Sequence, residues 1–381
     1  KQDDVMTVLV SYLPLQNKDS ELKPKPTQYA VRSLNSVGIQ PDIIIARAHE
    51  SIDEKRKEKI AFNCNIKQKN VISAPDIESI YEVPLNFEKD NLSEIILNHL
   101  KVVPKNTDLK EWKKLINSIK NPASLVKIGI VGKYFDTGNF VLADSYISVI
   151  EAIKHAAYWQ NKKPVIEWLN ASQFDHSNID AKKNLKKLSE YDGIIVPGGF
   201  GSRGVEGKIA VIKYCRENLI PYFGLCYGMQ LATVEFARNV AGLKKAQTTE
   251  IDSKTEEPVI DILEEQKNNL SLKNYGGTMR LGAYPAILKT GTITHKAYKT
   301  NKISERHRHR YEVNPKFVKL LEDKGLVFSG YSPDKKLMEI MELPREVHPF
   351  FLGTQFHPEF KSRPLAPHPL FMEFIKSASK K

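Results

Sequence analysis

The feature that most constrains this chain is an alternation of strand-sized apolar segments with helix-length segments between residues 126 and 240. The pattern predicts strands at 126–131, 165–169, 193–196 and 221–225, and helices at 144–159, 207–218 and 229–240. Strands that alternate with helices in this way usually form a mainly parallel sheet with helices on both faces. We therefore expect an α/β fold for this part of the chain.

A smaller unit comes first. Its pattern predicts strands at 5–14, 43–46 and 71–72, a Lys/Pro-rich loop at 23–26, and helices at 29–37 and 51–62. These strands are too few for a complete sheet, and the first begins with no loop before it, so we expect an incomplete domain at 1–103. Residues 104–124 are polar, with an amphipathic helix near 109–119, and we predict a linker there. A second domain is expected at 125–381.

Composition excludes several classes of protein. The chain has 57 Lys and Arg against 45 Asp and Glu, a net charge of +12, but bases and acids are interspersed, as at 54–59. Mixed charge is typical of a solvated face, so we expect no nucleic-acid partner, whereas excess base suits anionic small molecules such as nucleotides. No apolar run approaches the ~18–20 residues of a membrane helix, so we expect no membrane association. Only three cysteines are present, which argues against a disulfide framework and favours a reducing, cytoplasmic setting.

One of these cysteines has the sequence context of a nucleophile. Cys226 stands in Gly-Leu-Cys-Tyr-Gly at 224–228, between an expected strand and an expected helix. This is the thiol form of a nucleophile elbow, in which a sharp strand-to-helix turn needs glycines on both sides. The positive end of the following helix favours the thiolate. Cys64 and Cys215 have no such glycines and are expected to be buried structural thiols.

A base for this nucleophile is available near the end of the chain. An apolar segment at 351–356 leads into His357, Pro358 and Glu359. In an extended segment His357 and Glu359 project to the same side, so the carboxylate can orient the imidazole while its other nitrogen faces the thiol. Together with Cys226, these residues predict a Cys-His-Glu triad.

Two glycine-rich segments invite nucleotide-binding interpretations that we reject. Residues 199–204 fit G-x-G-x-x-G, but no acid follows the next strand for a ribose, and the Pro-Gly-Gly turn suits an oxyanion hole equally well. Gly207 and Lys208 resemble part of a phosphate loop, but Ile209 stands where Ser or Thr belongs and Ser202 where the first Gly belongs.

The elbow, the His-Pro-Glu segment and the Pro-Gly-Gly turn together resemble the class I glutamine amidotransferases. Further segments are similar to the CTP synthase family: 23–28, 38–42, 59–62, 79–81, 196–201, 276–282 and 305–314. Without this resemblance, the Arg/His run at 305–310 would be interpreted as a basic surface patch. The resemblance covers nearly the whole chain and implies a flavodoxin-like glutaminase domain after a partial Rossmann-like synthetase (amidoligase) domain.

The resemblance implies specific roles. Cys226, His357 and Glu359 would form the triad, with oxyanion contacts from Gly199 and the Tyr227 backbone. The glutamine site would comprise Gly199, Tyr227, Gly228, Met229, Gln230, Glu250 and Arg310, with Glu250 pairing the α-ammonium group. The UTP site, shared with CTP as feedback inhibitor, would comprise Lys23, Pro24, Lys25, Pro26, Thr27, Gln28 and Lys59. An edge of the ATP site would comprise Arg47, Pro75, Asp76 and Ile77. Phe200 would lie in a loop that responds to GTP.

The family's activity is the ATP-dependent amination of UTP to CTP with ammonia from glutamine, a step of pyrimidine biosynthesis. The resemblance implies ATP and Mg²⁺ in the full enzyme, GTP as allosteric activator, no redox cofactor and a homotetramer. Two departures stand out. Tyr227 replaces the usual Leu, and its larger ring would reshape the glutamine pocket. The family's N-terminal phosphate loop and Mg²⁺-binding acids have no counterpart here, so we expect a fragment with no metal site of its own.

Two alternatives remain open at this point. The chain could be another class I amidotransferase, such as the GMP synthetase type, although the segments at 23–28 and 307–311 argue against it. It could also be a non-catalytic regulatory or assembly subunit, although the intact Cys226, His357 and Glu359 argue against that.

Overall fold

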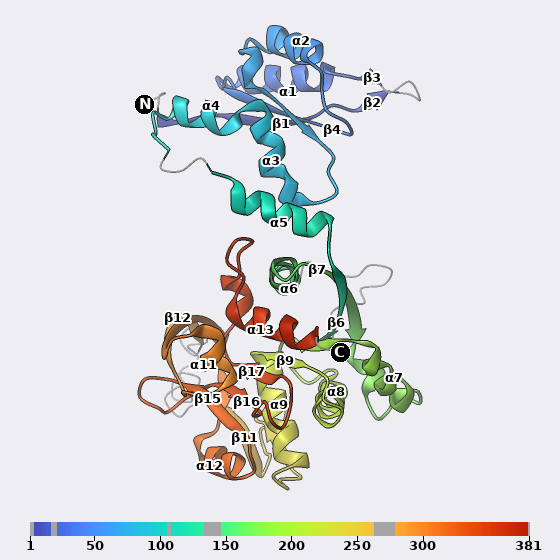
Figure 1. Cartoon of the computed structure of the whole chain (residues 1–381), viewed down its shortest axis with the longest axis vertical. Coiled ribbons are helices and arrows are strands. Elements are labelled where there is room, and N and C mark those ends of the chain that lie inside the picture. The colour runs from blue at the N-terminus through green and yellow to red at the C-terminus, as the bar shows by residue number, and fades with distance from the viewer. Residues whose placement is uncertain (1–3, 17–20, 105–107, 133–145, 263–278, 380–381) are drawn as a thin grey trace. The chain divides into compact units, whose positions relative to one another are not determined.

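A computed structural model of the chain describes residues 4–16, 21–104, 108–132, 146–262 and 279–379. The chain divides into two compact units, Lys1–Ile116 and Asn117–Lys381. The division falls within 104–124, the segment predicted as a linker, and inside its helix α5 (Lys110–Lys120). Figure 1 shows the elements of both units.

Unit 1 is built on a parallel three-stranded sheet of order β1-β4-β5. Its strands are β1 (Val8–Tyr12), β4 (Ile43–Ala48) and β5 (Val71–Pro75), with a short hairpin of β2 (Leu15–Gln16) and β3 (Glu21–Leu22). Its helices are α1 (Lys25–Ser36), α2 (Glu54–Cys64), α3 (Val83–Phe87), α4 (Leu92–His99) and α5. Ile44, Ala46 and Ile60 are among the residues of its main apolar core. The three strands expected from sequence are present, each with different ends.

The Lys/Pro-rich loop predicted at 23–26 is only partly a loop. Helix α1 already begins at Lys25, with Pro26 in its first turn. Proline is favourable there because its fixed φ suits a helix and its missing N–H would have no partner within the helix. The prolines therefore mark the start of α1, where the sequence analysis expected a loop before a later helix.

Unit 2 is built on a nine-stranded sheet among its described residues, of order β13-β12-β15-β16-β17-β9-β8-β6-β7. In chain order the strands are β6 (Ser124–Gly132), β7 (Lys162–Asn170), β8 (Gly193–Val196), β9 (Tyr222–Leu225), β12 (Arg280–Leu288), β13 (Lys302–His309), β15 (Val327–Tyr331), β16 (Met338–Glu342) and β17 (Phe351–Thr354). A second, three-stranded sheet comprises β10 (Ala246–Thr248), β11 (Glu257–Ile262) and β14 (Tyr311–Val313).

The α/β fold class is confirmed, but the large sheet is mixed rather than mainly parallel. From β17 through β9, β8 and β6 to β7 every neighbouring pair is parallel. From β13 through β12, β15 and β16 to β17 every pair is antiparallel. The parallel half could be predicted from the sequence because its strands alternate with helices. Within the antiparallel half, β15, β16 and β17 follow one another with no helix between them and lack that signal.

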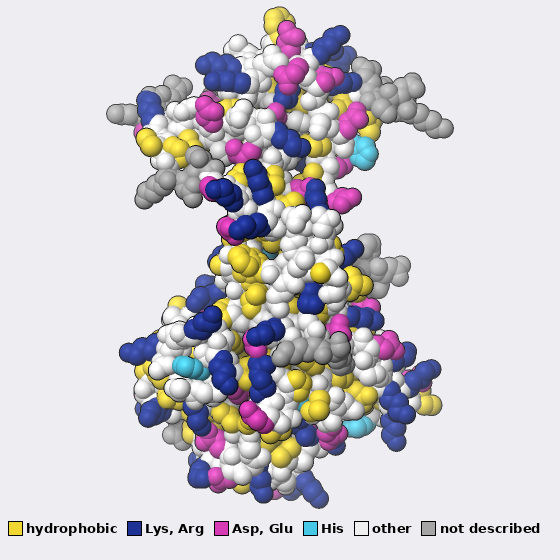
Figure 2. All heavy atoms as spheres, viewed as in Figure 1, with side chains coloured by type: hydrophobic (Ala, Val, Ile, Leu, Met, Phe, Trp, Pro, Cys, Tyr) yellow, Lys and Arg dark blue, Asp and Glu magenta, His cyan; other side chains and the backbone are white. Residues whose placement is uncertain are grey.

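Helices cover both faces of this sheet. The helices of unit 2 are α6 (Ile147–Trp159), α7 (Ala181–Lys187), α8 (Val205–Glu217), α9 (Tyr227–Asn239), α11 (Ile293–Tyr298), α12 (Pro315–Asp323) and α13 (Pro369–Ala378). One core cluster contains apolar side chains of α8 and α9, and the other contains those of α6 and α13. None of the described helices is long and apolar enough to cross a membrane. Figure 2 shows Lys and Arg side chains spread over the visible face with Asp and Glu between them.

The parallel strands bring three turns to one edge of the sheet. Val196 at the end of β8 is in register with Gly224 of β9, and Leu225 of β9 is in register with Thr354 of β17. The segments after these strands carry Gly198, Cys226 and His357. Because all three strands run in the same direction, these residues meet at their carboxyl ends, where ligands of open α/β sheets usually bind.

Candidate active site

Cys226 occupies a strained turn between β9 and α9. Its φ is 50° and its ψ −98°, a conformation that side chains with a Cβ rarely adopt. A Cβ on Gly224 would lie 2.7 Å from the Gly228 carbonyl carbon, and a Cβ on Gly228 would lie 2.1 Å from the Val196 oxygen. Both glycines are therefore required by close backbone packing, as the nucleophile-elbow prediction assumes.

His357 and Glu359 are in direct contact. His357 Nδ1 and Glu359 Oε1 are 2.7 Å apart, and the two residues are 9% and 7% exposed. Burial alone would lower the pKa of His357, but the charges of Glu359 and Cys226 raise it well above its usual value. The segment is not extended as predicted, because Glu359 lies in a 3₁₀ turn over Pro358–Lys361. Proline suits the first position of that turn, and the turn still brings the carboxylate to the imidazole.

The other nitrogen of His357 is the one available for proton transfer. Nε2 is buried, and besides Glu359 it is the Cys226 thiol that interacts with the imidazole, through its charge and a hydrogen bond. A Cβ on Gly198 would lie 2.9 Å from His357 Cε1 and 3.7 Å from Cys226 Cβ. The imidazole, the nucleophile and the Pro-Gly-Gly turn thus converge around one point, and only glycine leaves room for them.

The turn after β8 is hydrogen-bonded to the first residue of α9. The Tyr227 hydroxyl donates to the Gly201 carbonyl at 2.9 Å, and the Gly201 N–H donates to Glu250 Oε1 at 2.7 Å. Tyr227 is only 1% exposed, and the Lys208 ammonium lies 5.2 Å from its ring centroid. The ring of Tyr227 therefore packs against this turn and a buried lysine, an arrangement that a leucine could not provide.

The buried position of Lys208 also explains the false phosphate-loop signal. Lys208 is 1% exposed, and a Cβ on Gly207 would lie 1.9 Å from the Ala171 oxygen. Gly207 lets α8 approach the chain at residue 171, and neither residue presents itself to a bound phosphate.

Strand β13 supplies main-chain contacts to both the nucleophile and the base. The His357 N–H donates to the Arg306 carbonyl at 2.8 Å, and Cys226 Sγ lies 3.9 Å from the Arg308 carbonyl oxygen. Along β13 the side chains alternate, so that His307 and His309 are buried while Arg306 and Arg308 are exposed. The Arg/His run is therefore only half of a basic surface.

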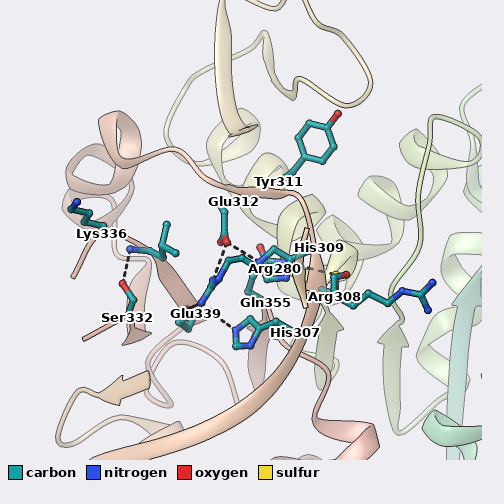
Figure 3. Close-up of polar contacts among 12 residues, drawn as sticks. Arg280, His307, Arg308, His309, Tyr311, Glu312, Ser332, Lys336, Glu339 and Gln355 are labelled. Atoms are coloured by element: carbon teal, nitrogen blue, oxygen red, sulfur yellow. Dashed lines mark hydrogen bonds and ion pairs between the residues drawn. The ribbon is translucent and has the colours of Figure 1, made fainter. Parts of the chain in front are cut away.

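The inward face of β13 belongs to a buried ionic cluster, which Figure 3 shows around Arg280. Arg280 donates to Glu312 and to Glu339, in both cases at 2.9 Å. His307 Nε2 lies 2.8 Å from Glu339 Oε2, and His309 Nε2 lies 2.7 Å from Glu312 Oε1. Burial alone would raise the pKa of Glu312, but His309 and Arg280 lower it. The cluster therefore pairs charges that would be costly to bury singly.

The residues assigned to glutamine gather around the elbow. Tyr227, Gly228, Met229 and Gln230 form the first turn of α9, and Glu250 contacts the turn after Gly199. Gln230 Nε2 donates to the carbonyl of Tyr311, the neighbour of Arg310. Burial and the charge of Glu250 raise the pKa of Tyr311, whereas the charge of Arg310 lowers it by less. Phe200, on the same turn as Gly199, is 48% exposed.

Comparisons with known proteins agree with this geometry. The family model "CTP synthase N-terminus" matches residues 1–102, and "Glutamine amidotransferase class-I" matches residues 141–377. A CTP synthase of Caldanaerobacter subterraneus subsp. tengcongensis is 49% identical over 376 residues, which are 99% of this chain and 67% of that protein. One from Methanocaldococcus jannaschii is 47% identical over 378 residues, with 99% and 68% covered. The chain belongs to the CTP synthase family.

A solved structure supports the same assignment for unit 2. The glutaminase domain of Trypanosoma brucei CTPS with bound acivicin is 36% identical, with a TM-score of 0.61. The match covers 67% of this chain and 94% of that domain. Membership of the CTP synthase family confirms the resemblance found in the sequence, and with it the α/β glutaminase fold. The family segment at 276–282 lies partly outside the described residues, which resume at Met279.

Some of the residues predicted from the sequence to bind nucleotides lie at the carboxyl edge of the unit 1 sheet. Arg47 of β4 forms an ion pair with Asp76, 3.0 Å apart, directly after β5. The Asp76 N–H donates to the Ala48 carbonyl at 2.9 Å, and the Lys23 N–H donates to the Pro14 carbonyl at 3.1 Å. Arg47 lies near the carboxyl end of β4 and Asp76 directly follows β5, whereas Lys23 follows β3 of the antiparallel hairpin. Lys59 is separate, exposed along α2.

The first turn of α1 provides the remaining part of the predicted UTP site. Thr27 is fully buried and its hydroxyl lies 2.9 Å from that of Ser11, while Lys25 and Pro26 are exposed. Gln28 donates its N–H to the Pro24 carbonyl. Pro75 and Ile77, assigned to ATP, are half-buried beside Asp76. No three His, Cys, Asp or Glu side chains in the described ranges are placed to hold a metal ion.

Sequence reasoning missed several residues that complete the site. Gln355 is fully buried, and its Nε2 lies 3.8 Å from Cys226 Sγ. Thr354 accepts a hydrogen bond from the Cys226 N–H through its carbonyl. Glu339 and Arg280 are hydrogen-bonded to each other on the buried side of β13, where Glu339 also contacts His307. The alternation at 305–309 was a usable signal for buried histidines, but the contacts of Gln355 depend on the pairing of β17 with β9.

Proposed function

We propose that this chain hydrolyses glutamine at Cys226, with His357 as general base and Glu359 as its orienting carboxylate. The observation that carries the proposal is the convergence of three elements: the strained Cys226, the His357–Glu359 pair and the glycine turn at Gly198. A strained thiol beside an oriented imidazole is the arrangement used for covalent acyl transfer. Membership of the CTP synthase family supports the choice of glutamine as acyl donor.

The steps follow from these positions. His357 takes the thiol proton, and the Cys226 sulfur attacks the side-chain carbonyl carbon of glutamine, whose oxygen becomes negative. The N–H groups of Gly199 and Tyr227 would stabilise that oxyanion. The imidazolium, held by Glu359, then gives its proton to the leaving nitrogen, which departs as ammonia. Water, deprotonated by His357, attacks the γ-glutamyl thioester and restores the thiol, releasing glutamate.

The second half of the proposal concerns the ammonia. We propose that in the full enzyme it aminates UTP to CTP at the expense of ATP, with Lys23–Gln28 and Lys59 holding UTP or CTP, and with Arg47 and Pro75–Ile77 beside ATP. The positions of Arg47, Pro75 and Asp76 at the carboxyl edge of the unit 1 sheet support a nucleotide site there. The need for Mg²⁺ in the full enzyme stays a prediction from the family resemblance. GTP activation through Phe200, a homotetramer and a cytoplasmic location stay predictions from family resemblance.

The glutaminase proposal is tested by measuring glutamate and ammonia released from glutamine by the whole chain. Replacement of Cys226 by Ala should abolish release, and His357→Ala should lower it by about 100-fold or more, the usual contribution of a general base. Cys215→Ala is the matched control, because Cys215 is also a buried thiol but lies in α8 away from the triad. Release that survives in Cys226→Ala, or that is lost equally in Cys215→Ala, would contradict the proposal.

A further inference from the structure

The amide of Gln355 has no role in the triad, yet it contacts the sulfur that reacts. Gln355 is fully buried directly after β17, and its Nε2 lies 3.8 Å from Cys226 Sγ. The Gln355 N–H donates to the Glu339 carbonyl at 2.8 Å, and the preceding residue, Thr354, accepts from the Cys226 N–H at 2.6 Å. The main chain thus fixes Gln355 beside the nucleophile through contacts on both sides.

The orientation of this amide is set by a short chain of hydrogen bonds. The carbonyl of Tyr311 can only accept, so the group 2.8 Å from it must be the NH₂ of Gln230. The same NH₂ lies 3.2 Å from Gln355, whose facing atom must therefore be the oxygen Oε1. The NH₂ of Gln355 is consequently left to face Cys226 Sγ. A flipped Gln355 would place two donors against each other at Gln230.

The two neighbours of the sulfur favour different protonation states. The Arg308 carbonyl, 3.9 Å from Sγ, can accept a hydrogen bond only from the neutral thiol. The Gln355 NH₂ can donate to sulfur, and a donor stabilises the anion more than the thiol. The titratable group beside the thiol is His357, whose charge acts in the same direction as the Gln355 donor. When Cys226 loses its proton, the hydrogen bond from Gln355 therefore compensates for the lost hydrogen bond to the Arg308 carbonyl.

We propose that Gln355 is a further catalytic residue, whose side-chain amide donates a hydrogen bond to Cys226 and stabilises its thiolate, with Gln230 holding the amide in the donating orientation. This inference deepens the proposed glutaminase function and rests on Cys226 being its nucleophile. Figure 3 shows Gln355 near the ionic cluster of Arg280, Glu312 and Glu339. The carbonyl of Glu339 accepts the hydrogen bond from the Gln355 N–H. Gln230 acts through Gln355 and is a positioning residue in this respect.

The test measures how fast iodoacetamide alkylates Cys226 across a pH series, with the Cys226 peptide quantified by mass spectrometry. Gln355→Met keeps the side-chain length but removes the donor. We expect the midpoint of its pH profile to move up by about one unit, because a hydrogen bond to a charged group contributes roughly that much. Below both midpoints, alkylation of the variant should be about tenfold slower. Gln355→Glu should move the midpoint further, since it places a carboxylate beside the sulfur.

Two more variants keep the test decisive. Thr233→Val is the control, because it removes a buried 3.0 Å hydrogen bond to the Met229 carbonyl on the same helix and does not touch the sulfur; its midpoint should equal that of the unchanged chain. If Gln355→Met does not fold, Gln230→Met should still raise the midpoint, by less. A midpoint that stays unchanged in a folded Gln355→Met or Gln230→Met variant would overturn the proposal. Alkylation needs no glutamine, so failure of the glutaminase proposal would be seen separately, as hydrolysis that survives in Cys226→Ala.

Discussion

The N–H of Cys226 donates a hydrogen bond to the carbonyl of Thr354 at 2.6 Å, which joins the turn carrying the nucleophile to the strand that leads to the base. The residues are 128 positions apart in the chain, yet β9 and β17 are parallel neighbours. His357, three residues after Thr354, is thereby held at a fixed place relative to the thiol. The relative position of nucleophile and base is thus set by main-chain pairing.

Glu359 should matter less than His357. Glu359→Gln retains a group that can accept a hydrogen bond from His357 Nδ1 but removes the charge that raises the pKa of the imidazole. We expect glutamine hydrolysis to fall by roughly tenfold to 100-fold, less than in His357→Ala, as kcat at saturating glutamine would show. A Glu359→Gln variant as inactive as His357→Ala would assign Glu359 a direct part in proton transfer.

Loss of Arg280 should destabilise unit 2 strongly. Arg280→Met leaves Glu312 and Glu339 buried without their cation, which costs about 3–5 kcal/mol in comparable buried pairs. Urea denaturation would measure the change in unfolding free energy. Arg345→Met is the matched control, since Arg345 pairs with Glu373 while about a third of its side chain is exposed, and about 1 kcal/mol or less is expected. An equal decrease in unfolding free energy in the two variants would show that the buried cluster stabilises the fold no more than the partly exposed pair does.

Acid should destabilise the fold through His348. Its Nε2 donates to the Cys215 carbonyl and its Nδ1 accepts from the Phe350 N–H, so protonation of Nδ1 would break a buried hydrogen bond. Burial lowers the pKa of His348 to about 4, from 6.5. Between pH 6.5 and about pH 4, His348 binds a proton in the unfolded chain but not in the folded chain. The free energy of unfolding therefore falls as pH decreases, by roughly 3 kcal/mol in total.

The variant for this prediction is His348→Asn, with unfolding free energy measured between pH 6.5 and pH 4. Its stability should depend less steeply on pH than that of the unchanged chain. His176→Gln, at an exposed histidine, should leave the slope as it was. His155 has a similarly lowered pKa of about 4, again chiefly from burial, so part of the slope should remain. An unchanged slope in His348→Asn would refute the assignment.

Nucleotide binding should depend on the lysines of unit 1. Reversing the charge at Lys23, Lys25 and Lys59 together should weaken UTP binding at least about tenfold, because each ammonium complements phosphate charge. Titration calorimetry with UTP would measure the dissociation constant. Lys55→Glu, on the same exposed helix as Lys59, is the matched control and should change affinity little. Binding that is unaffected by the triple reversal would place the triphosphate elsewhere.

The sequence was informative where the chemistry is local. The elbow at Cys226 and the pair His357–Glu359 each lie within five residues, so spacing alone could suggest them. The ionic cluster could not be predicted from the sequence, because Arg280, Glu312 and Glu339 come together only when the strands of two sheets pack. The antiparallel half of the large sheet was missed for the same reason, since its order, β13-β12-β15-β16, depends on long-range pairing.

The central claim is that Cys226 is the glutaminase nucleophile, and active-site labelling tests it most directly. The whole chain is incubated with an electrophilic glutamine analogue, with and without excess glutamine, and the adducts are mapped by mass spectrometry. The account predicts one adduct per chain, on Cys226, which glutamine suppresses and which forms more slowly in His357→Ala. An adduct on Cys64 or Cys215, or none on Cys226 while glutamine hydrolysis proceeds, would contradict it.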